Sequence, residues 1–294
     1  MAGRNLIVLP LLATVAGIAT FSAMDAAMKG ASIAAGVYTA LFIRGWLASL
    51  LIVPAWLATG RKLPSAAAMR VHLQRSVVVV AMAPLFFWGL VRIPIAEAIA
   101  ISFIAPLIAL YFARLILGEQ IRPAAILASL LGIAGVLVIG AGRFGEGAFT
   151  RDSVLGIVAI LSSAVFYAMN LVLQRKQALL AGPVEIALFQ NLIVALIFTL
   201  PAPLLFVLPD MEGFKLITLA AVLALVALLF LSWGYARAEA QVLLPIEYTG
   251  FLWAALFGWL FFDETVRPAT LAGAVLIVVG CLIAARNHTE QTAV

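Results

Sequence analysis

Charged residues are scarce in this sequence. Asp, Glu, Lys and Arg make up 11% of its 294 residues, whereas soluble domains average about 25%. Hydrophobic residues make up 65%, and one soluble core of this size could not bury so much apolar surface. The composition therefore excludes a soluble enzyme and a disordered chain, and it indicates that lipid surrounds most of the protein.

Cysteine and histidine are nearly absent. Cys281 is the one cysteine, which excludes a secreted disulfide scaffold. Two histidines, His72 and His288, are too few for a metal centre, so we expect no metal and no cofactor. No Walker A, HExxH or GxSxG motif occurs, so the chain is not expected to be an enzyme. The net charge of +5 is expected to reflect membrane orientation and not nucleic-acid binding.

Long apolar runs fill the chain instead. A spanning helix needs about 20 mostly apolar residues, and these runs are continuous and rich in Leu and Ala, unlike the alternating pattern of a β-barrel. Charge, Pro and Gly collect between them. The sequence predicts an all-α integral membrane protein with ten spans, at 6–28, 38–58, 76–92, 95–115, 123–141, 153–173, 183–203, 215–236, 240–262 and 268–285.

The sequence also matches itself at a shift of 145 residues. The aligned features include Trp88 with Trp233, and Glu119-Gln120-Ile121-Arg122-Pro123 with Glu264-Thr265-Val266-Arg267-Pro268. This predicts two five-helix repeats, 1–145 and 146–294. Because five is odd, the second repeat enters the membrane from the opposite side, as in secondary transporters with inverted repeats around a central cavity.

Loop charges predict the orientation. The loop after the second span carries Arg61, Lys62, Arg70 and Arg75, whereas its equivalent after the seventh span carries Asp210, Glu212 and Lys215. By the positive-inside rule, both termini are expected in the cytoplasm, and the protein in the inner membrane.

Several stretches are typical of one family. They are Leu117-Gly118-Glu119, Leu244-Pro245-Ile246-Glu247-Tyr248-Thr249, and Gly258-Trp259-Leu260-Phe261-Phe262-Asp263-Glu264. With the duplicated unit, the chain resembles the EamA-type branch of the drug/metabolite transporter superfamily. Asp263 departs from the family pattern, which often has glycine there. The resemblance implies ten helices, cytoplasmic termini, a central cavity and export of amino acids or similar small metabolites.

The matched positions of spans 4 and 9 are the first candidates for substrate binding. The shift places Ser102 opposite Glu247 and Phe103 opposite Tyr248. Glu247 lies about seven residues into its span, so its carboxylate must pair, accept hydrogen bonds or take up a proton. It is either a substrate-ammonium partner, a proton-coupling acid or a structural carboxylate bonded to another helix.

Two prolines interrupt these spans. Pro245 frees the carbonyl of Gln241 from helical hydrogen bonding, so it is either a hinge or an ordinary packed kink. Pro106 is a second hinge candidate, although it does not occupy the equivalent position of the other repeat.

Polar and aromatic stripes give further candidates. Ser163, Tyr167 and Asn170 share one helix face, which either lines the cavity or joins helices. Phe21 and Met24 share a face of the first span that either packs or adapts to varied ligands.

Three candidates stand outside these stripes. Gln190 lies some way into its span and has the same two interpretations as the polar stripe. Arg44 lies roughly 9 Å into its span, so it either snorkels to the interface or recognises a carboxylate. Phe42 is a candidate for an aromatic cavity.

Other charged residues suggest structural roles. Asp25 and Lys29 are spaced as a surface ion pair at the end of the first span. Glu119 and Glu264, beside Arg122 and Arg267, suggest clamps at two connections. Small residues spaced by four predict close helix approach within the chain or in a homodimer, at Ala128, Gly132, Ala269 and Gly273.

The inverted repeat predicts a secondary transporter that works by alternating access, and the family resemblance implies that it exports small metabolites, most readily amino acids. Aromatic or large apolar amino acids are slightly favoured, because several aromatic candidates could line one cavity: Phe21, Phe42, Phe103, Tyr167 and Tyr248. Proton coupling stays open. The alternatives are a multidrug carrier, which would need a membrane-depth acid in the first span, a nucleotide-sugar or phosphate-ester carrier, a passive channel and a membrane enzyme.

Overall fold

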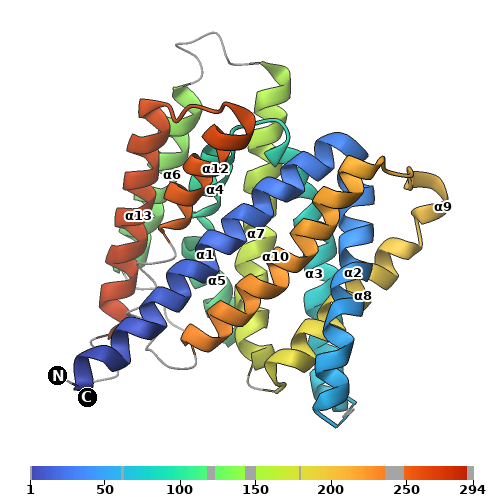
Figure 1. The fold of residues 1–294 in the computed structure, drawn as a ribbon. Helices are drawn as coiled ribbons and strands as arrows, with labels where there is room; N and C mark the ends of the chain where they lie inside the picture. Colours follow the sequence, from blue (N-terminus) through green and yellow to red (C-terminus); the bar gives the residue numbers. More distant parts are fainter. Residues whose placement is uncertain are drawn as a thin grey trace.

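The computed structural model is a bundle of tilted helices (Figure 1). The structure describes residues 2–60, 63–117, 123–142, 150–178, 180–235 and 248–289. Those residues form helices, turns and connections, with no strand among them. The all-α fold predicted from the apolar runs is therefore confirmed.

Each predicted span contains a helix. In the first half these are α1 (Ala2–Ala35), α2 (Val37–Ala58), α3 (Ala66–Leu90), α4 (Ile95–Ser102), α5 (Ala105–Leu117) and α6 (Pro123–Ala141). In the second half they are α7 (Arg151–Ala178), α8 (Pro183–Thr199), α9 (Ala202–Leu205), α10 (Met211–Tyr235), α12 (Gly250–Phe262) and α13 (Pro268–Thr289).

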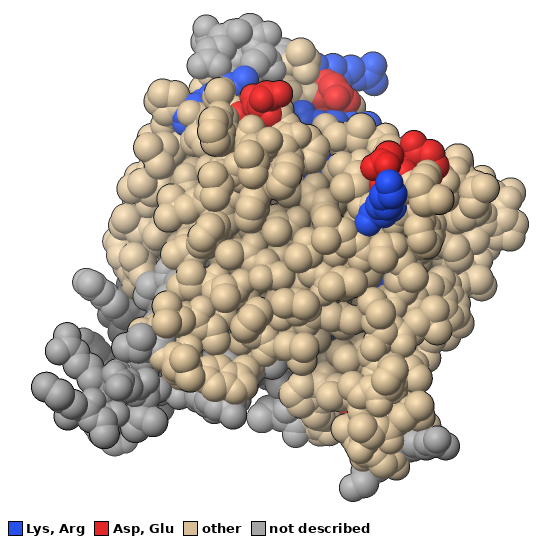
Figure 2. All heavy atoms as spheres, viewed as in Figure 1, with Lys and Arg blue, Asp and Glu red and all other residues tan. Residues whose placement is uncertain are grey.

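Five of the described helices are long and apolar enough to cross a membrane. They provide the stretches Leu9–Ala35, Val37–Ala58, Ala66–Leu90, Arg151–Gln174 and Met211–Leu231. The remaining predicted spans correspond to shorter apolar helical stretches. On the face in Figure 2, the described charged side chains gather at the upper end above a broad uncharged surface, as expected where lipid contacts the protein.

Local chemistry explains where the helices depart from the predicted spans. α1 continues to Ala35 and ends before Gly36, whose φ of 79° suits glycine. α3 begins early because the Ser65 hydroxyl accepts a hydrogen bond from the Ala68 amide at 3.1 Å. Arg70 and Arg75 therefore lie on α3 and not in a loop, which corrects the sequence analysis.

Contacts between helices follow a two-fold pattern. α1 of the first half lies along α10 of the second, and the pair that the repeat relates to it, α7 of the second half and α3 of the first, is also in contact. The pairs α2 with α8, α6 with α13 and α4 with α12 join equivalent helices of the two halves. Two five-helix units related by a pseudo-two-fold axis give this pattern.

The closest of these approaches joins α6 and α13. An added Cβ on Gly135 would lie 2.6 Å from the carbonyl oxygen of Gly273, and one on Gly273 would lie 2.5 Å from that of Gly135. The two backbones meet here without side chains between them. The predicted small-residue approach is thus present at Gly273, with Gly135 as its partner.

Candidate functional site

Phe103 and Tyr248 meet in the interior, as their matched positions in the two repeats predict. Their rings form an edge-to-face pair with centroids 5.2 Å apart. Both pack against the main apolar core, which also contains Met24 and Phe87 and is flanked by Phe42. An aromatic centre between the two halves is therefore present, and edge-to-face geometry is the arrangement that aromatic pairs prefer.

The fourth predicted span breaks beside this aromatic pair. α4 ends at Ser102 and α5 begins at Ala105. Pro106 has no amide hydrogen, so the Ser102 carbonyl loses its helical donor. The Ser102 hydroxyl donates back to the Ala98 carbonyl at 2.7 Å. The break next to Pro106 is thus observed, and its use as a hinge stays a prediction.

Asp25 lies deep in α1 and not at its end. It precedes Ala35 by ten residues, about 15 Å along a helix, which is half the thickness of a bilayer core. The residue is only 3% exposed. The helix continues seven residues beyond the predicted span 6–28, which is why a carboxylate at membrane depth was not predicted here.

Arg44 lies opposite Asp25, seven residues into α2. The two side chains interact electrostatically. An Nη atom of Arg44 lies 4.0 Å from the Met24 sulfur, and the guanidinium carbon lies 5.9 Å from the Phe87 ring centroid. Arg44 thus points into the interior, and its buried Nε has no hydrogen-bond partner among the described residues. Snorkelling does not explain this position.

Four more residues in the described part of the chain, Ser32, Ser76, Gln190 and Trp253, have buried polar atoms without a hydrogen-bond partner. Both polar atoms of the Gln190 amide are buried without a hydrogen bond, and so is the indole nitrogen of Trp253. Buried donors and acceptors are normally paired, because leaving one unpaired costs about 1–3 kcal/mol. Gln190 was predicted from the sequence, whereas Trp253 was not.

Lys29 does not pair with Asp25, which corrects the surface pair expected from their spacing. Its ammonium donates to the Ile93 carbonyl at 2.9 Å and forms an ion pair with Glu264. The other oxygen of Glu264 accepts from the Ile95 amide at 2.8 Å. Glu264 therefore clamps α1 and the start of α4, both of which belong to the other half of the chain.

A second ion pair lies beside this one. Arg267 donates to Glu97 at 3.0 Å, and Glu97 is 2% exposed. The Glu264 amide bonds to Gly258 across Asp263, whose φ of 53° is the left-handed conformation that glycine adopts easily. We call the cluster formed by Lys29, Ile93, Ile95, Glu97, Glu264 and Arg267 the Lys29 network.

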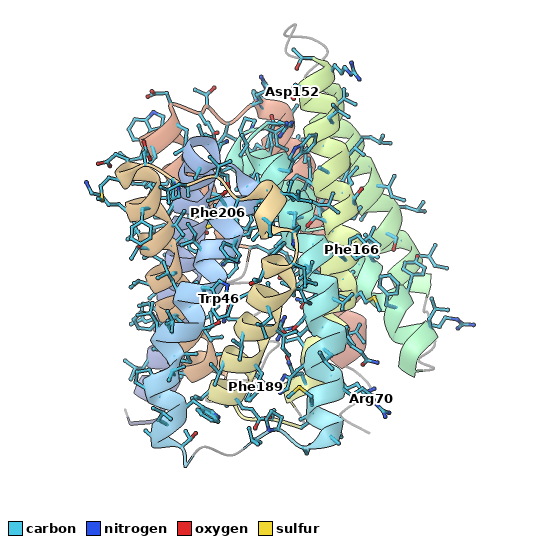
Figure 3. All side chains as sticks on the ribbon, turned by 90° about the vertical axis from the view of Figure 1, so that its right-hand side faces the viewer. Trp46, Arg70, Asp152, Phe166, Phe189 and Phe206 are labelled. Atoms are coloured by element: carbon cyan, nitrogen blue, oxygen red, sulfur yellow. The ribbon has the colours of Figure 1, made fainter. Side chains whose placement is uncertain are left out.

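A different polar cluster joins the halves at the other end. Arg75 donates to Asn170 at 2.8 Å, to Gln174 at 3.2 Å and also to Gln177. Gln177 in turn contacts His72, whose Nε2 lies 3.3 Å from Glu185. We call these residues the Arg75 network. Figure 3 shows that the two ends are far apart, with Arg70 near one and Asp152 near the other.

Arg75→Gln should weaken the packing of α3 on α7 and α8. The shorter side chain cannot reach Asn170, Gln174 and Gln177 together, so buried amides lose their donor. We expect a loss of about 2 kcal/mol in unfolding free energy, measured by thermal unfolding in detergent. Arg70→Gln is the control, because Arg70 is exposed on the same helix; an equal effect there would contradict the assignment.

The remaining predicted residues divide between packing and exposure. Ser163 donates to the Met82 carbonyl at 2.9 Å, and Asn170 is held by Arg75, so this stripe joins helices at both positions. Phe21 and Tyr167 are exposed, by 47% and 37%, and lie outside the aromatic centre. Glu247 and Pro245 fall outside the described residues.

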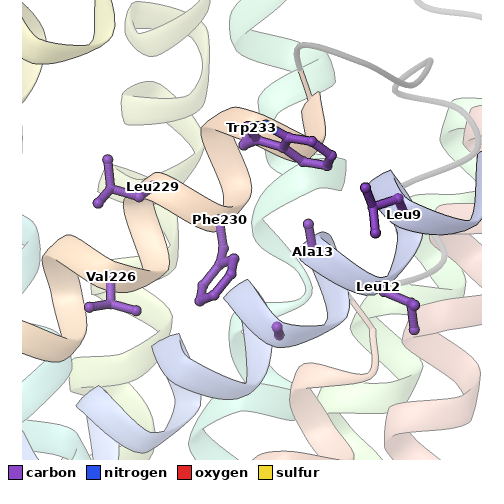
Figure 4. A pocket seen from close by; sticks show the side chains of 8 residues that line it. Leu9, Leu12, Ala13, Val226, Leu229, Phe230 and Trp233 are labelled. Atoms are coloured by element: carbon purple, nitrogen blue, oxygen red, sulfur yellow. The ribbon is translucent and has the colours of Figure 1, made fainter. Parts of the chain in front are cut away.

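A cavity of about 600 Å³ lies between α1 and α10 (Figure 4). Its walls are apolar and include Leu9, Leu12, Leu229, Phe230 and Trp233. The residues predicted for substrate binding do not line it. Among the described residues, no three His, Cys, Asp or Glu side chains are grouped to hold a metal ion.

Two named relatives match over nearly the whole chain, and a third matches over about a third of it. The pseudopaline exporter CntI of Pseudomonas aeruginosa is 31% identical over 279 residues, which is 94% of this chain and 95% of that protein. The riboflavin transporter of Brucella anthropi is 25% identical, over 95% of this chain and 100% of its own. The aromatic amino acid exporter YddG of Ancylobacter novellus is 32% identical over 32% of each chain.

A solved crystal structure has the same fold. It superposes with a TM-score of 0.64 at 22% identity and covers 94% of this chain and 96% of its own. The model of the EamA-like transporter family matches twice, at residues 8–141 and 154–286. The chain is therefore a multi-pass membrane protein that belongs to the EamA-like transporter family.

Proposed function

We propose that this protein is a secondary carrier that exports small metabolites, with amino acids as the first candidates. The observation that carries this proposal is Arg44, whose buried Nε has no partner among the described residues and whose guanidinium lies against Met24 and Phe87 of the core that Phe103 and Tyr248 pack on. Gln190 and Trp253 also have buried polar atoms without a partner among the described residues. Such groups are costly in a membrane unless something binds them. The named relatives carry small molecules, which agrees with this role.

The two networks support alternating access. Each joins the first half of the chain to the second, and they lie at opposite ends of the bundle. A carrier needs such contacts to form at one end while they break at the other. We place both termini in the cytoplasm of a cell with an inner membrane, following the loop charges, which puts the Lys29 network on the outer side.

Flux from proteoliposomes tests this function. Vesicles preloaded with a mixture of amino acids, riboflavin and cationic dyes should release a subset, saturably and with counter-exchange. Unsaturable release would indicate a channel, and no release of any compound would overturn the proposal. An imposed pH gradient tests coupling, for which Glu247 stays the predicted acid.

Replacing Tyr248 with leucine should weaken the binding of aromatic substrates. The substitution keeps apolar volume but removes the edge-to-face partner of Phe103. We expect KM for phenylalanine to rise about five- to tenfold, because an aromatic pair contributes about 0.5–1.5 kcal/mol, with a smaller change for leucine. Trp259→Leu is the matched control, since Trp259 is 62% exposed. Equal KM values for both variants would refute the aromatic preference.

One observation favours a second candidate, a carrier of cationic drugs. Such a carrier needs a membrane-depth acid in its first helix, and Asp25 has that position. A cationic substrate would pair with Asp25 alone, whereas Arg44 would repel it. Transport of an amine that has no carboxylate would therefore distinguish this candidate from the first.

A further inference from the structure

Asp25 is buried and Arg44 is half-buried, and the two charges do not satisfy each other. No hydrogen bond to the Asp25 carboxylate is found in the described structure, and the buried Nε of Arg44 has no partner there either. Lys29, one turn from Asp25, is committed to Glu264 and Ile93 instead. Each member of the pair thus keeps unused capacity for hydrogen bonds.

A structural ion pair would be built differently. Arginine and carboxylate normally meet in short, frequently bidentate contacts, and a buried pair recovers its desolvation cost only when the remaining polar atoms are also bonded. Here the guanidinium rests against the Met24 sulfur and faces the Phe87 ring. The two charged side chains lie near each other without a direct hydrogen bond. This arrangement is typical of a site that binds a ligand between them.

Asp25 and Arg44 also lie at similar depths in the membrane. Asp25 lies ten residues before the end of α1, and Arg44 lies seven residues after the start of α2, with Gly36 between the helices. The two side chains therefore project from adjacent helices at a similar level. Met24 and Phe87 supply apolar surface beside them, and both belong to the core that the aromatic pair Phe103 and Tyr248 packs against.

We propose that Asp25 and Arg44 together recognise an amphoteric substrate, with Asp25 binding its ammonium group and Arg44 binding its carboxylate. A small zwitterion inserted between the two side chains completes the hydrogen bonds of both and brings no net charge into the membrane. The substrate side chain then lies toward Met24 and Phe87. This inference rests on the proposed transport function and names the substrate class for it.

Substrate analogues test the pair in the unaltered protein. L-Phenylalanine is compared with 2-phenylethylamine, which lacks the carboxylate, and with 3-phenylpropionate, which lacks the ammonium. L-Leucine is compared with 3-methylbutylamine and 4-methylpentanoate in the same way. Each compound competes with counterflow of the labelled amino acid. We expect both analogues of each set to compete about tenfold to a hundredfold more weakly than the amino acid, as for a lost charge-assisted hydrogen bond.

Two variants then assign the roles. Asp25→Asn should weaken competition by the amino acid and the amine while leaving that by the carboxylate-only analogue unchanged. Arg44→Gln should do the reverse, sparing the amine. Glu212→Gln and Arg70→Gln are the controls, because both residues are exposed. Analogue competition in the unaltered protein does not depend on whether a variant folds.

Four results would overturn the inference. Amines that compete as well as amino acids would make Asp25 a site for cations alone. An Asp25→Asn protein that loses its response to a pH gradient but keeps its preference for zwitterions would make Asp25 a proton-coupling group. Saturable flux of riboflavin or dyes with no amino-acid flux would leave the carrier function standing and remove the amphoteric site. No flux of any compound would remove both.

Discussion

Gly135→Leu should prevent stable folding. A Cβ at this position would lie 2.6 Å from the Gly273 carbonyl oxygen and 2.6 Å from Cγ1 of Ile277, and neither backbone can move without separating α6 from α13. Overpacking of a close contact costs about 1–3 kcal/mol and occasionally more, and here the obstacle includes backbone. We expect a loss of at least 3 kcal/mol, seen as a strong drop in detergent-extracted monodisperse protein and in its unfolding temperature.

Gly140→Leu provides the control on the same helix. A Cβ at Gly140 meets no atom within 4 Å, and the substitution is equally apolar and raises helix propensity. Its stability should equal that of the unaltered protein or exceed it slightly. If the Gly135 variant were as stable as the Gly140 variant, that result would contradict the close approach of the α6 and α13 backbones at Gly135.

Glu264→Gln should open the Lys29 end of the molecule. The substitution removes the ion-pair partner of the Lys29 ammonium, which is 5% exposed, and removing one member of a buried pair costs about 3 kcal/mol or more. That cost falls on the state in which this end is closed. The population with this end open should therefore rise at least tenfold.

Cysteine labelling measures this opening. Ala96→Cys places a thiol on the first turn of α4, where Ala96 is 4% exposed, in a chain whose Cys281 is replaced by serine. A membrane-impermeant maleimide should react at least tenfold faster when Glu264→Gln is added. Glu212→Gln serves as control, since its pair with Lys215 is exposed and surface pairs contribute little. Unchanged labelling would show that the network does not hold this end shut.

The membrane fold could be predicted from the sequence, because lipid imposes a simple rule of length and composition. Every predicted span contains a helix. The ends of the helices were harder to predict, since they depend on single residues. Gly36 stops α1 by adopting positive φ, and Ser65 starts α3 by capping it; neither residue interrupts the apolar pattern strongly enough to be seen.

The site was predicted in part. The shift of 145 residues placed Phe103 opposite Tyr248, because pseudo-symmetry brings matched positions of equivalent helices together. It could not reveal that Lys29 pairs with Glu264, 235 residues away, in preference to its near neighbour Asp25. The choice between local and distant partners is decided by packing. The depth of Asp25 was not predicted, because the end of the first helix was placed too early.

The Lys29 network has a consequence for sidedness. The repeat equivalent of Lys29 is Gln174, a neutral residue that belongs to the Arg75 network, and the equivalent of Glu97 is Val242. The Lys29 end is thus fastened by the ion pairs of Lys29 with Glu264 and of Arg267 with Glu97. At the matching positions the sequence keeps the charges of Glu119 and Arg122, but Gln174 and Val242 replace their two partners. In the carrier that we propose, opening the two ends is therefore not the same process run in mirror image, and the empty protein has a resting orientation that a symmetric duplication would lack.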